Sequence, residues 1–435
     1  MSHIGIDFGT TNSALAVAGD DGPPRVATFS LHGEATTTFR SLLYFEEEGE
    51  WVGGRPAPWI GPRAIEQYLA TDGEGRLMQS MKTFLASRVV KGTTVLGHDF
   101  PLERLVALIV EGLWRGASER MGLTRPRTLV AGRPVRFAGS DGDDGDRHAE
   151  ARLRAALSMA GFDDVELVLE PVAAALHYEG GLARDETVLV ADFGGGTSDF
   201  CVLRVGPSYR YSGADRERIL GTRGVGVAGD DLDARIVRHV VAPALGAGTM
   251  YRSQMGNVLE IPPGIFDKLE RWNELSFLKS RRNIDMLLGY LRTAREPDRI
   301  RALIHLVEHN LGHRLYRTVE AAKVRLSSAD EATIELVDGP LVVRGRLTRA
   351  DFERWIAPEL DALARCVDAL LADVGLASDA IDTVFLTGGT GQVPAVRRLF
   401  AERFGEERLR TGDFLTSIAS GLALHARRRA RAGVP

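Results

Sequence analysis

The chain has 435 residues, of which 44% are hydrophobic and 26% are charged, so it can bury cores for about two or three domains. Its net charge of −5 gives no overall basic field, which argues against nucleic acid as a partner. Two isolated cysteines, Cys201 and Cys366, argue against a disulfide framework. No leader and no apolar run of about 18 residues is found, so we expect a cytoplasmic protein without membrane contact.

The first predicted element is a hairpin. An apolar, β-prone run ends in the carboxylate of Asp7, turns on glycine and resumes as the apolar run of residues 14–17. Glycine lets the backbone approach an anion closely, and an aspartate at a strand end can hold a hydrated Mg²⁺. The segment therefore predicts a phosphate-holding hairpin with the turn residues Gly9, Thr10, Thr11 and Asn12.

Alternating strands and helices follow the first hairpin. Period and composition predict strands at 41–52, 128–134 and 165–169, and helices at 63–68, 103–119, 149–159 and 172–178. Between them lies Lys82, one of only five lysines among 54 basic residues. In a chain that otherwise uses arginine, a lysine suggests that its position needs a compact ammonium group. Chance explains the presence of five lysines equally well.

A second hairpin repeats the first near the middle of the chain. The run of residues 189–193 carries Asp192, turns on Gly194, Gly195, Gly196 and Thr197, and resumes over residues 200–205. Two such hairpins suggest that a nucleotide is held between two related halves.

The remaining elements complete an α/β pattern. Residues 224–229 match G-x-G-x-x-G but follow charged residues, so we interpret them as a turn before a helix at Asp230. His305, Glu308 and His309 fit a metalloprotease spacing, which we interpret as a packing or solvent-facing stripe. We expect a mostly helical stretch to about 327, strands at 333–337, 341–343 and 383–386, a glycine-rich turn at 388–391, and helices at 351–374 and 418–429.

Six segments, in order, resemble the nucleotide-binding domain of the 70-kDa heat-shock chaperones, the DnaK family. They are residues 5–13, 81–85, 170–175, 192–199, 320–323 and 388–394. The resemblance spans nearly the whole chain and implies the actin-like ATPase (ribonuclease H-like) fold, with two lobes around a nucleotide cleft. It implies a first lobe at 1–184 with a subdomain at about 33–104, a second lobe at 185–409 with a helical cap at about 224–350, and a helix at 410–435 returning to the first lobe.

The resemblance also implies a site for ATP or ADP and Mg²⁺. Asp7 and Asp192 would hold the metal largely through water, while Lys82, Glu170 and Asp199 would act in hydrolysis. The two hairpin turns, including Gly194, would cradle the phosphates. The remaining nucleotide contacts would come from Glu320, Lys323, Ser327, Gly388, Gly389, Thr390 and Gln392.

Three departures from the family pattern carry expectations of their own. Val324 and Gln392 occupy the positions of two arginines that usually enclose adenine, which implies weaker adenine contact. Residues 241–313, with Trp272, Phe277 and Tyr290, are longer than their counterpart and predict an enlarged helical cap. The chain ends soon after the ATPase body, as in truncated, YegD-like relatives of DnaK that lack the linker and the peptide-binding domain.

The sequence leaves several functions open. The first is a slow, chaperone-like ATPase whose nucleotide controls binding of a protein client or co-chaperone. A small-molecule kinase, an actin-like filament protein and a non-hydrolysing nucleotide-binding scaffold are the alternatives on the same fold. Retention of the segments around Lys82, Glu320 and Lys323 favours the ATPase.

Overall fold

A computed structural model describes residues 2–71, 74–126, 128–209, 218–271, 275–411 and 416–431. The chain forms two compact units, Met1–Gly229 with Asp361–Pro435, and Asp230–Leu360. Strands and helices occur in both, which confirms the predicted α/β class. These units divide the chain elsewhere than the two predicted lobes do, so the lobes stay a prediction.

The first sheet of the larger unit contains the first hairpin. Its strand order is β15-β14-β1-β2-β3, with β6 pairing to β2. Strands β1 and β2 are antiparallel and place Asp7 opposite Ala14, whereas β14 runs parallel to both β1 and β15. The strands are β1 (His3–Asp7), β2 (Asn12–Ala18), β3 (Arg25–Val26), β6 (Phe39–Arg40), β14 (Thr128–Arg133) and β15 (Asp164–Leu169).

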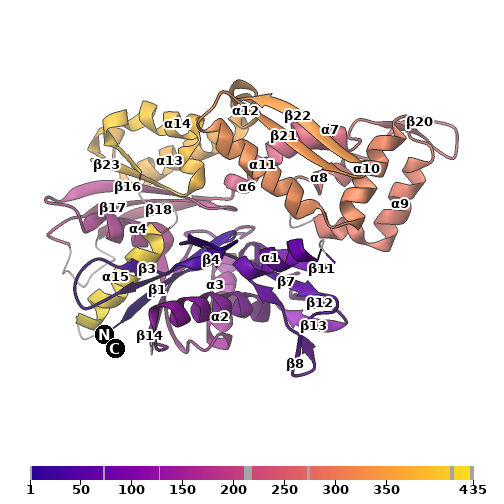
Figure 1. The fold of residues 1–435 in the computed structure, drawn as a ribbon. Helices are drawn as coiled ribbons and strands as arrows, with labels where there is room; N and C mark the ends of the chain where they lie inside the picture. Colours follow the sequence, from indigo (N-terminus) through magenta and orange to yellow (C-terminus); the bar gives the residue numbers. More distant parts are fainter. Residues whose placement is uncertain are drawn as a thin grey trace. The chain divides into compact units, whose positions relative to one another are not determined.

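The second sheet repeats this arrangement around the second hairpin (Figure 1). Its order is β24-β23-β16-β17-β18, and the two antiparallel and two parallel pairings occur in the same sequence as in the first sheet. The strands are β16 (Glu186–Phe193), β17 (Ser198–Val205), β18 (Ile219–Val225), β23 (Thr383–Thr387) and β24 (Leu409–Thr411). The two sheets that contain the repeated motif therefore share one topology.

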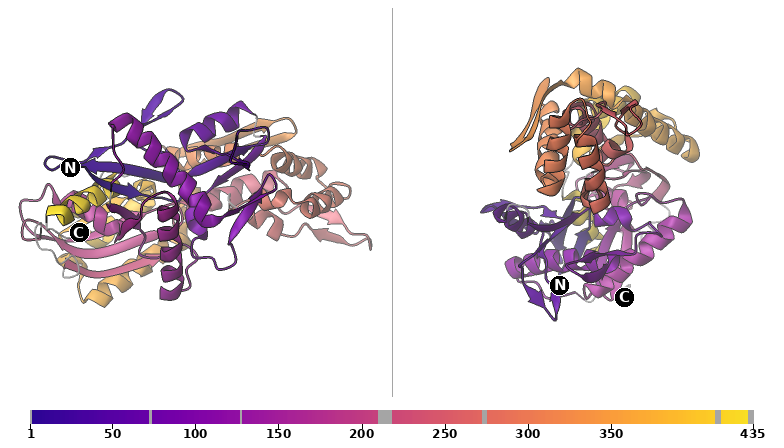
Figure 2. Two further views of the ribbon diagram at one scale, coloured as in Figure 1. Left: turned by 90° about the horizontal axis from the view of Figure 1, so that it is seen from below. Right: turned by 90° about the vertical axis from the view of Figure 1, so that its right-hand side faces the viewer.

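Helices cover both sheets. Helix α15 (Ser417–Arg431) packs on β1, β2, β14 and α4 (Glu170–Glu179), and Figures 1 and 2 show it lying along these elements. The packing is so close that a Cβ on Gly421 would collide with the backbone of Ala173. The other covering helices are α2 (Leu102–Met121), α3 (Asp143–Met159), α13 (Ala357–Val374) and α14 (Pro394–Phe404). No helix among the described residues is long and apolar enough to span a bilayer.

A buried ion-pair cluster fastens α15 to α4. The carboxylate of Glu179 is fully buried and accepts hydrogen bonds from the guanidinium groups of Arg218 and Arg428. It also accepts a hydrogen bond from the backbone N–H of Gly206 at 3.1 Å. Because each carboxylate oxygen has a cationic partner, this buried charge is compensated.

The rest of the larger unit's first half consists of short elements. A three-stranded sheet has the order β10-β7-β11, and its residues Leu42 and Tyr44 pack with Tyr68 of α1. These elements are β4 (Phe29–Leu31), β5 (Glu34–Thr36), β7 (Leu42–Glu46), β8 (Trp51–Val52), β9 (Arg55–Pro56), β10 (Trp59–Ile60), α1 (Pro62–Ala70), β11 (Gly75–Gln79), η1 (Met81–Phe84), β12 (Gly92–Val95) and β13 (His98–Pro101).

The smaller unit combines helices with two hairpins. Helix α11 packs against β21, and α10 packs against β22 and α9. The elements are α6 (Gly229–Ile236), η2 (Val237–Val241), α7 (Ala242–Ala244), β19 (Met250–Arg252), β20 (Val258–Glu260), α8 (Gly264–Asp267), η3 (Leu275–Lys279), α9 (Arg281–Leu291), α10 (Pro297–Glu308), α11 (Gly312–Leu326), β21 (Glu331–Asp338), β22 (Leu341–Thr348) and α12 (Arg349–Trp355).

Several local predictions need correction. The G-x-G-x-x-G segment is not all turn, because β18 runs on to Val225. The helix predicted at 351–374 is two helices that meet at Ile356, and Pro358 stands at the start of the second, where its missing N–H costs least. The long stretch predicted as helical contains the β19–β20 hairpin. Trp272 and the side chain of Phe277 lie outside the described residues.

Candidate functional site

The first hairpin places Asp7 and its turn at one end of the first sheet. The four turn residues Gly9 to Asn12 are partly exposed, so their backbone groups are accessible to a ligand. A Cβ on Gly9 would collide with the carbonyl oxygen of Asn12, so this tight turn requires glycine.

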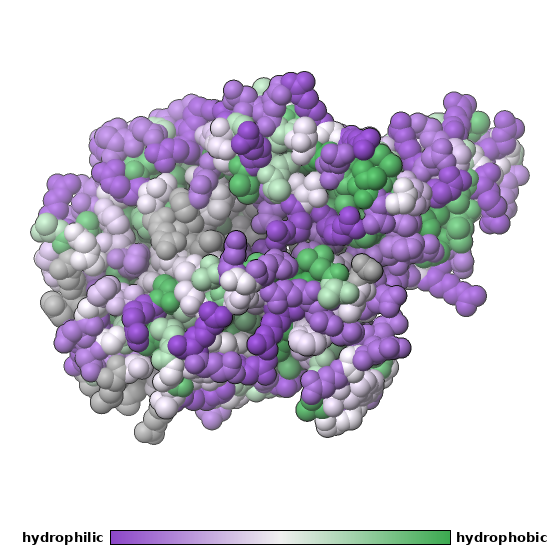
Figure 3. All heavy atoms as spheres, in the orientation of Figure 1, coloured by the Kyte–Doolittle hydropathy of each residue, from purple (hydrophilic) through white to green (hydrophobic). Residues whose placement is uncertain are grey.

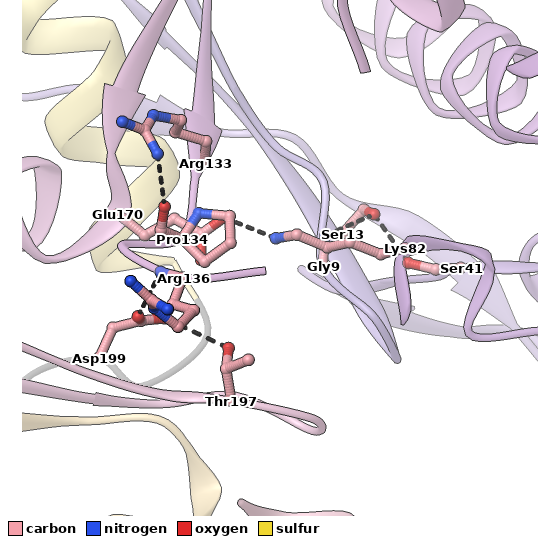
Figure 4. A network of polar contacts seen from close by, with 10 residues as sticks. All are labelled: Gly9, Ser13, Ser41, Lys82, Arg133, Pro134, Arg136, Glu170, Thr197 and Asp199. Carbon is pink, nitrogen blue, oxygen red and sulfur yellow. Dashed lines mark hydrogen bonds and ion pairs between the residues drawn. The ribbon is translucent and has the colours of Figure 1, made fainter. Parts of the chain in front are cut away.

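A clamp that the motif alone did not predict fixes this turn. The backbone N–H of Gly9 donates to Ser13 Oγ at 3.3 Å, and the hydroxyls of Ser13 and Ser41 lie 2.8 Å apart (Figure 4). Arg40 Nη1 donates to Asn12 Oδ1 at 3.2 Å. Because β6 pairs with β2, residues far apart in sequence hold the turn in one conformation.

The second hairpin is held by its own hydrogen bonds. Asp192 and Asp199 lie opposite each other on β16 and β17. The N–H of Gly194 donates to the carbonyl of Thr197 at 2.9 Å, and the Thr197 hydroxyl donates to Asp199 Oδ2 at 3.2 Å. Asp199 Oδ1 accepts the backbone N–H of Arg136 at 3.1 Å (Figure 4). Gly195 and Gly196, which lie between Gly194 and Thr197 in this turn, are partly buried.

Lys82 and Glu170 form a buried ion pair. Lys82 Nζ lies 2.6 Å from Glu170 Oε1, and the two residues are only 7% and 6% exposed (Figure 4). Lys82 belongs to the short helix η1, and Glu170 begins α4 directly after β15. Lys82 and Glu170 were both predicted as site residues and lie 88 positions apart in the sequence. The structure shows that they are direct partners.

The electrostatics show that Asp7, Asp192 and Asp199 share this environment. Burial raises the pKa of Asp7 to about 7, the charge of Glu170 adds to the rise, and the charge of Lys82 opposes it. Burial and the charge of Glu170 likewise raise the pKa of Asp199 to about 7 and that of Asp192 well above its usual value. One ammonium thus faces four buried or partly buried carboxyl groups.

Lys82 itself is held in its charged form. Burial alone would lower its pKa, but the negative charges of Glu170 and Asp7 outweigh burial, so the pKa of Lys82 is raised. A fixed ammonium next to several carboxylates can stabilise negative charge on a bound phosphate.

The glycine-rich turn after β23 lies against the second hairpin. Gly388 has a φ of +82°, and a Cβ there would collide with the carbonyl oxygen of Phe193. Thr390 is buried, whereas Gly389 and Gln392 are exposed. The larger unit thus brings this turn, both glycine-turn hairpins and the Lys82–Glu170 pair into one body.

The remaining predicted residues lie on α11 of the smaller unit. Lys323 Nζ pairs with Asp233 Oδ2 at 2.7 Å, and burial together with neighbouring carboxylates raises the pKa of Asp230 to about 7. Glu320 lies near the middle of α11, and Ser327 is the cap residue at its C-terminal end. Asp233 was not predicted as a site residue. An aspartate in the first turns of a helix usually reflects only the favourable interaction of negative charge with the helix N-terminus. Nucleotide contacts from α11 stay a prediction.

The mixed α/β fold with its two sheets of one topology is of the actin-like ATPase class. A family model described as Hsp70 protein matches residues 3–247 and 303–428. The chaperone protein DnaK of Thermus thermophilus is 29% identical over 452 residues, covering 97% of this chain and 60% of the relative. DnaK of Thermosipho africanus is 28% identical over 433 residues, covering 97% and 58%.

The chain therefore belongs to the Hsp70 family and is similar to the nucleotide-binding domain of its DnaK-like members. It spans about 60% of the length of the curated relatives that it matches.

Proposed function

We propose that this chain binds ATP with Mg²⁺ and hydrolyses it slowly, as a conformational switch. The observation that carries the proposal is the buried cluster of Lys82 with Glu170, Asp7, Asp192 and Asp199 beside two glycine turns. Family membership supports it, because Hsp70 proteins are ATPases.

The carboxylates fit Mg²⁺. Asp7 and Asp192 are oxygen donors at the ends of the corresponding strands β1 and β16 of the two sheets, and burial together with the nearby charge of Glu170 raises the pKa of both. Hard divalent cations prefer such oxygen ligands and often keep several waters. Asp7 and Asp192 would hold the Mg²⁺, which would supply positive charge that offsets the charge of the phosphates.

The protein's own groups would position the reaction. Backbone N–H groups of both turns, around Thr10, Thr11 and residues 195–197, would bind the phosphate oxygens. Lys82 would stabilise charge at the terminal phosphate, and Glu170 would hold Lys82 in place. Asp199, fixed by Arg136 and Thr197, would orient the attacking water and accept its proton.

In the larger unit, the turn at Gly388 to Gln392 would contact the adenosine. Val324 has an aliphatic side chain and Gln392 a neutral amide, so neither residue can stack a guanidinium group on adenine. We therefore propose modest adenine selectivity. Nucleotide exchange would control binding of a protein client or co-chaperone in the cytoplasm.

A metal-dependence experiment tests the proposal. Asp192→Asn should abolish most of the difference in ADP affinity measured with and without Mg²⁺, because the variant loses a metal-holding charge. Asp141→Asn, at an exposed position of the same unit, is the matched control and should behave as the wild type. An equal Mg²⁺ dependence in both variants would refute the assignment of Asp192.

A further inference from the structure

The β19–β20 hairpin lies in the one internal segment that the Hsp70 family model leaves unmatched. The model omits residues 248–302, and these form β19, β20, α8, η3, α9 and the first half of α10 among the described residues. A family-wide role therefore does not account for their surface features.

One edge of this hairpin has unpaired backbone groups. The N–H of Ser253 bonds to Asn257, and that of Ile261 bonds to Thr249, so by alternation the backbone groups of Val258 and Glu260 point away from β19. The opposite edge is occupied, because Arg252 donates to the carbonyl of residue 293 and residue 295 donates to that of residue 250. Within the described chain, nothing pairs with the outer edge of β20.

Apolar side chains accompany this free edge. Val258 and Leu259 are 40% and 46% exposed, and Met255 at the hairpin turn is 90% exposed. Leu288 on α9, whose Tyr290 ring contacts Tyr251 at 4.7 Å between centroids, is 40% exposed. Figure 3 shows green apolar spheres among purple ones in the region where Figure 1 labels β20 and α9. An exposed apolar strand edge is a ready template for another strand.

The segment also differs in charge from the rest of the chain. Residues 248–302 contain ten Lys and Arg against seven Asp and Glu, a net charge of +3. The whole chain carries −5, so the remainder carries −8. Five exposed arginines of the segment have no ion-pair partner within the described ranges: Arg252, Arg281, Arg282, Arg292 and Arg295.

We propose that the outer edge of β20 binds an extended, acidic segment of a partner protein as a third strand. Backbone hydrogen bonds to Val258 and Glu260 would supply the pairing. Partner side chains opposite Leu259 would be apolar, since they share its face with Tyr251. On the other face, the side chain opposite Val258 would be acidic, about 10 Å, or two strand spacings, from Arg252, whereas the exposed Glu260 disfavours an acidic side chain opposite itself.

The probes are short fluorescein-labelled peptides that alternate glutamate with valine, leucine, phenylalanine or tyrosine. Binding to the full chain is followed by fluorescence anisotropy without nucleotide, so failure here is independent of the proposed ATP hydrolysis. At least one peptide should bind, and N-methylation of alternate residues should abolish binding because it blocks edge hydrogen bonds. Replacing glutamate by lysine should also abolish it.

Val258→Pro removes one outward N–H and should weaken peptide binding by roughly five-fold or more, a range consistent with one lost hydrogen bond. The matched control Val258→Thr keeps the N–H and the strand preference and should bind as the wild type does. Arg252→Glu, which leaves the backbone unchanged, should also weaken binding. Unchanged thermal unfolding of each variant shows that the fold is kept.

Three results would overturn the proposal. The first is that no peptide of the series binds, and the second is that Val258→Pro and the wild type bind equally well. The third is self-association, seen by sedimentation of the wild type and abolished by Val258→Pro, because the edge would then be occupied by a second copy of this chain.

Discussion

Replacing Lys82 by methionine should remove most ATP hydrolysis and leave nucleotide binding nearly intact. Methionine keeps the length and volume of the side chain but removes the ammonium that lies 2.6 Å from Glu170. In the proposed mechanism this charge acts chiefly on the transition state, whereas many backbone groups of the two turns hold the ground-state phosphates.

The expected loss is large. Removing one preorganised charge or donor that faces a developing negative charge typically lowers kcat by about 10²–10³-fold, or about 3–4 kcal/mol. The variant should also be less stable, because breaking a buried ion pair costs about 3–5 kcal/mol.

The assay is single-turnover phosphate release with saturating Mg²⁺ and ATP, accompanied by calorimetric titration of ADP. It is run below the melting temperature of the variant, so that loss of fold does not imitate loss of chemistry. Lys91→Met is the control, since Lys91 is exposed. Turnover of Lys82→Met equal to that of the control would exclude Lys82 from the mechanism.

Three further predictions concern pH and packing. Burial raises the pKa values of Asp7 and Asp199 in the folded protein from 3.8 to about 7. Between about pH 4 and pH 7 the folded state therefore binds more protons than the unfolded state, and the metal-free protein should lose stability as the pH rises through this range. Its Tm should be higher at pH 6 than at pH 8, with Mg²⁺ and ADP reducing the difference; equal Tm values would contradict this. Gly388→Ala should cost about 1–3 kcal/mol in urea unfolding because φ is +82° and the Cβ collides with backbone, whereas Gly389→Ala, with open space, should be nearly neutral. Arg428→Met leaves a fully buried carboxylate with one arginine fewer and should lower stability by about 1–3 kcal/mol, measured the same way; no change would show that Arg218 alone suffices.

The sequence predicted what is local and repeated. Asp7 and Asp192 each follow an apolar run and precede a glycine turn, and this pattern alone predicts a hairpin in both places. The similarity of the two segments suggested two related halves, and the structure adds that the two sheets share one strand order.

Features that depend on distant partners were missed. Ser41 and Arg40 fix the first turn only because β6 pairs with β2, and no local pattern reveals this pairing. Asp233 belongs to an ordinary helix start, and its partner Lys323 lies 90 residues away. The β19–β20 hairpin was missed because each of its strands pairs only three residues. So short a strand does not show a clear alternation of apolar and polar residues.

The most direct test of the central claim is calorimetric titration of the protein with ATP, ADP and GTP in Mg²⁺, with phosphate release followed in the same samples. The proposed site predicts Mg²⁺-dependent binding of ATP and ADP, a modest preference over GTP and slow release of phosphate. Absence of nucleotide binding in the presence of Mg²⁺ would contradict it, and the buried cluster around Lys82 would then have to be explained as structure alone.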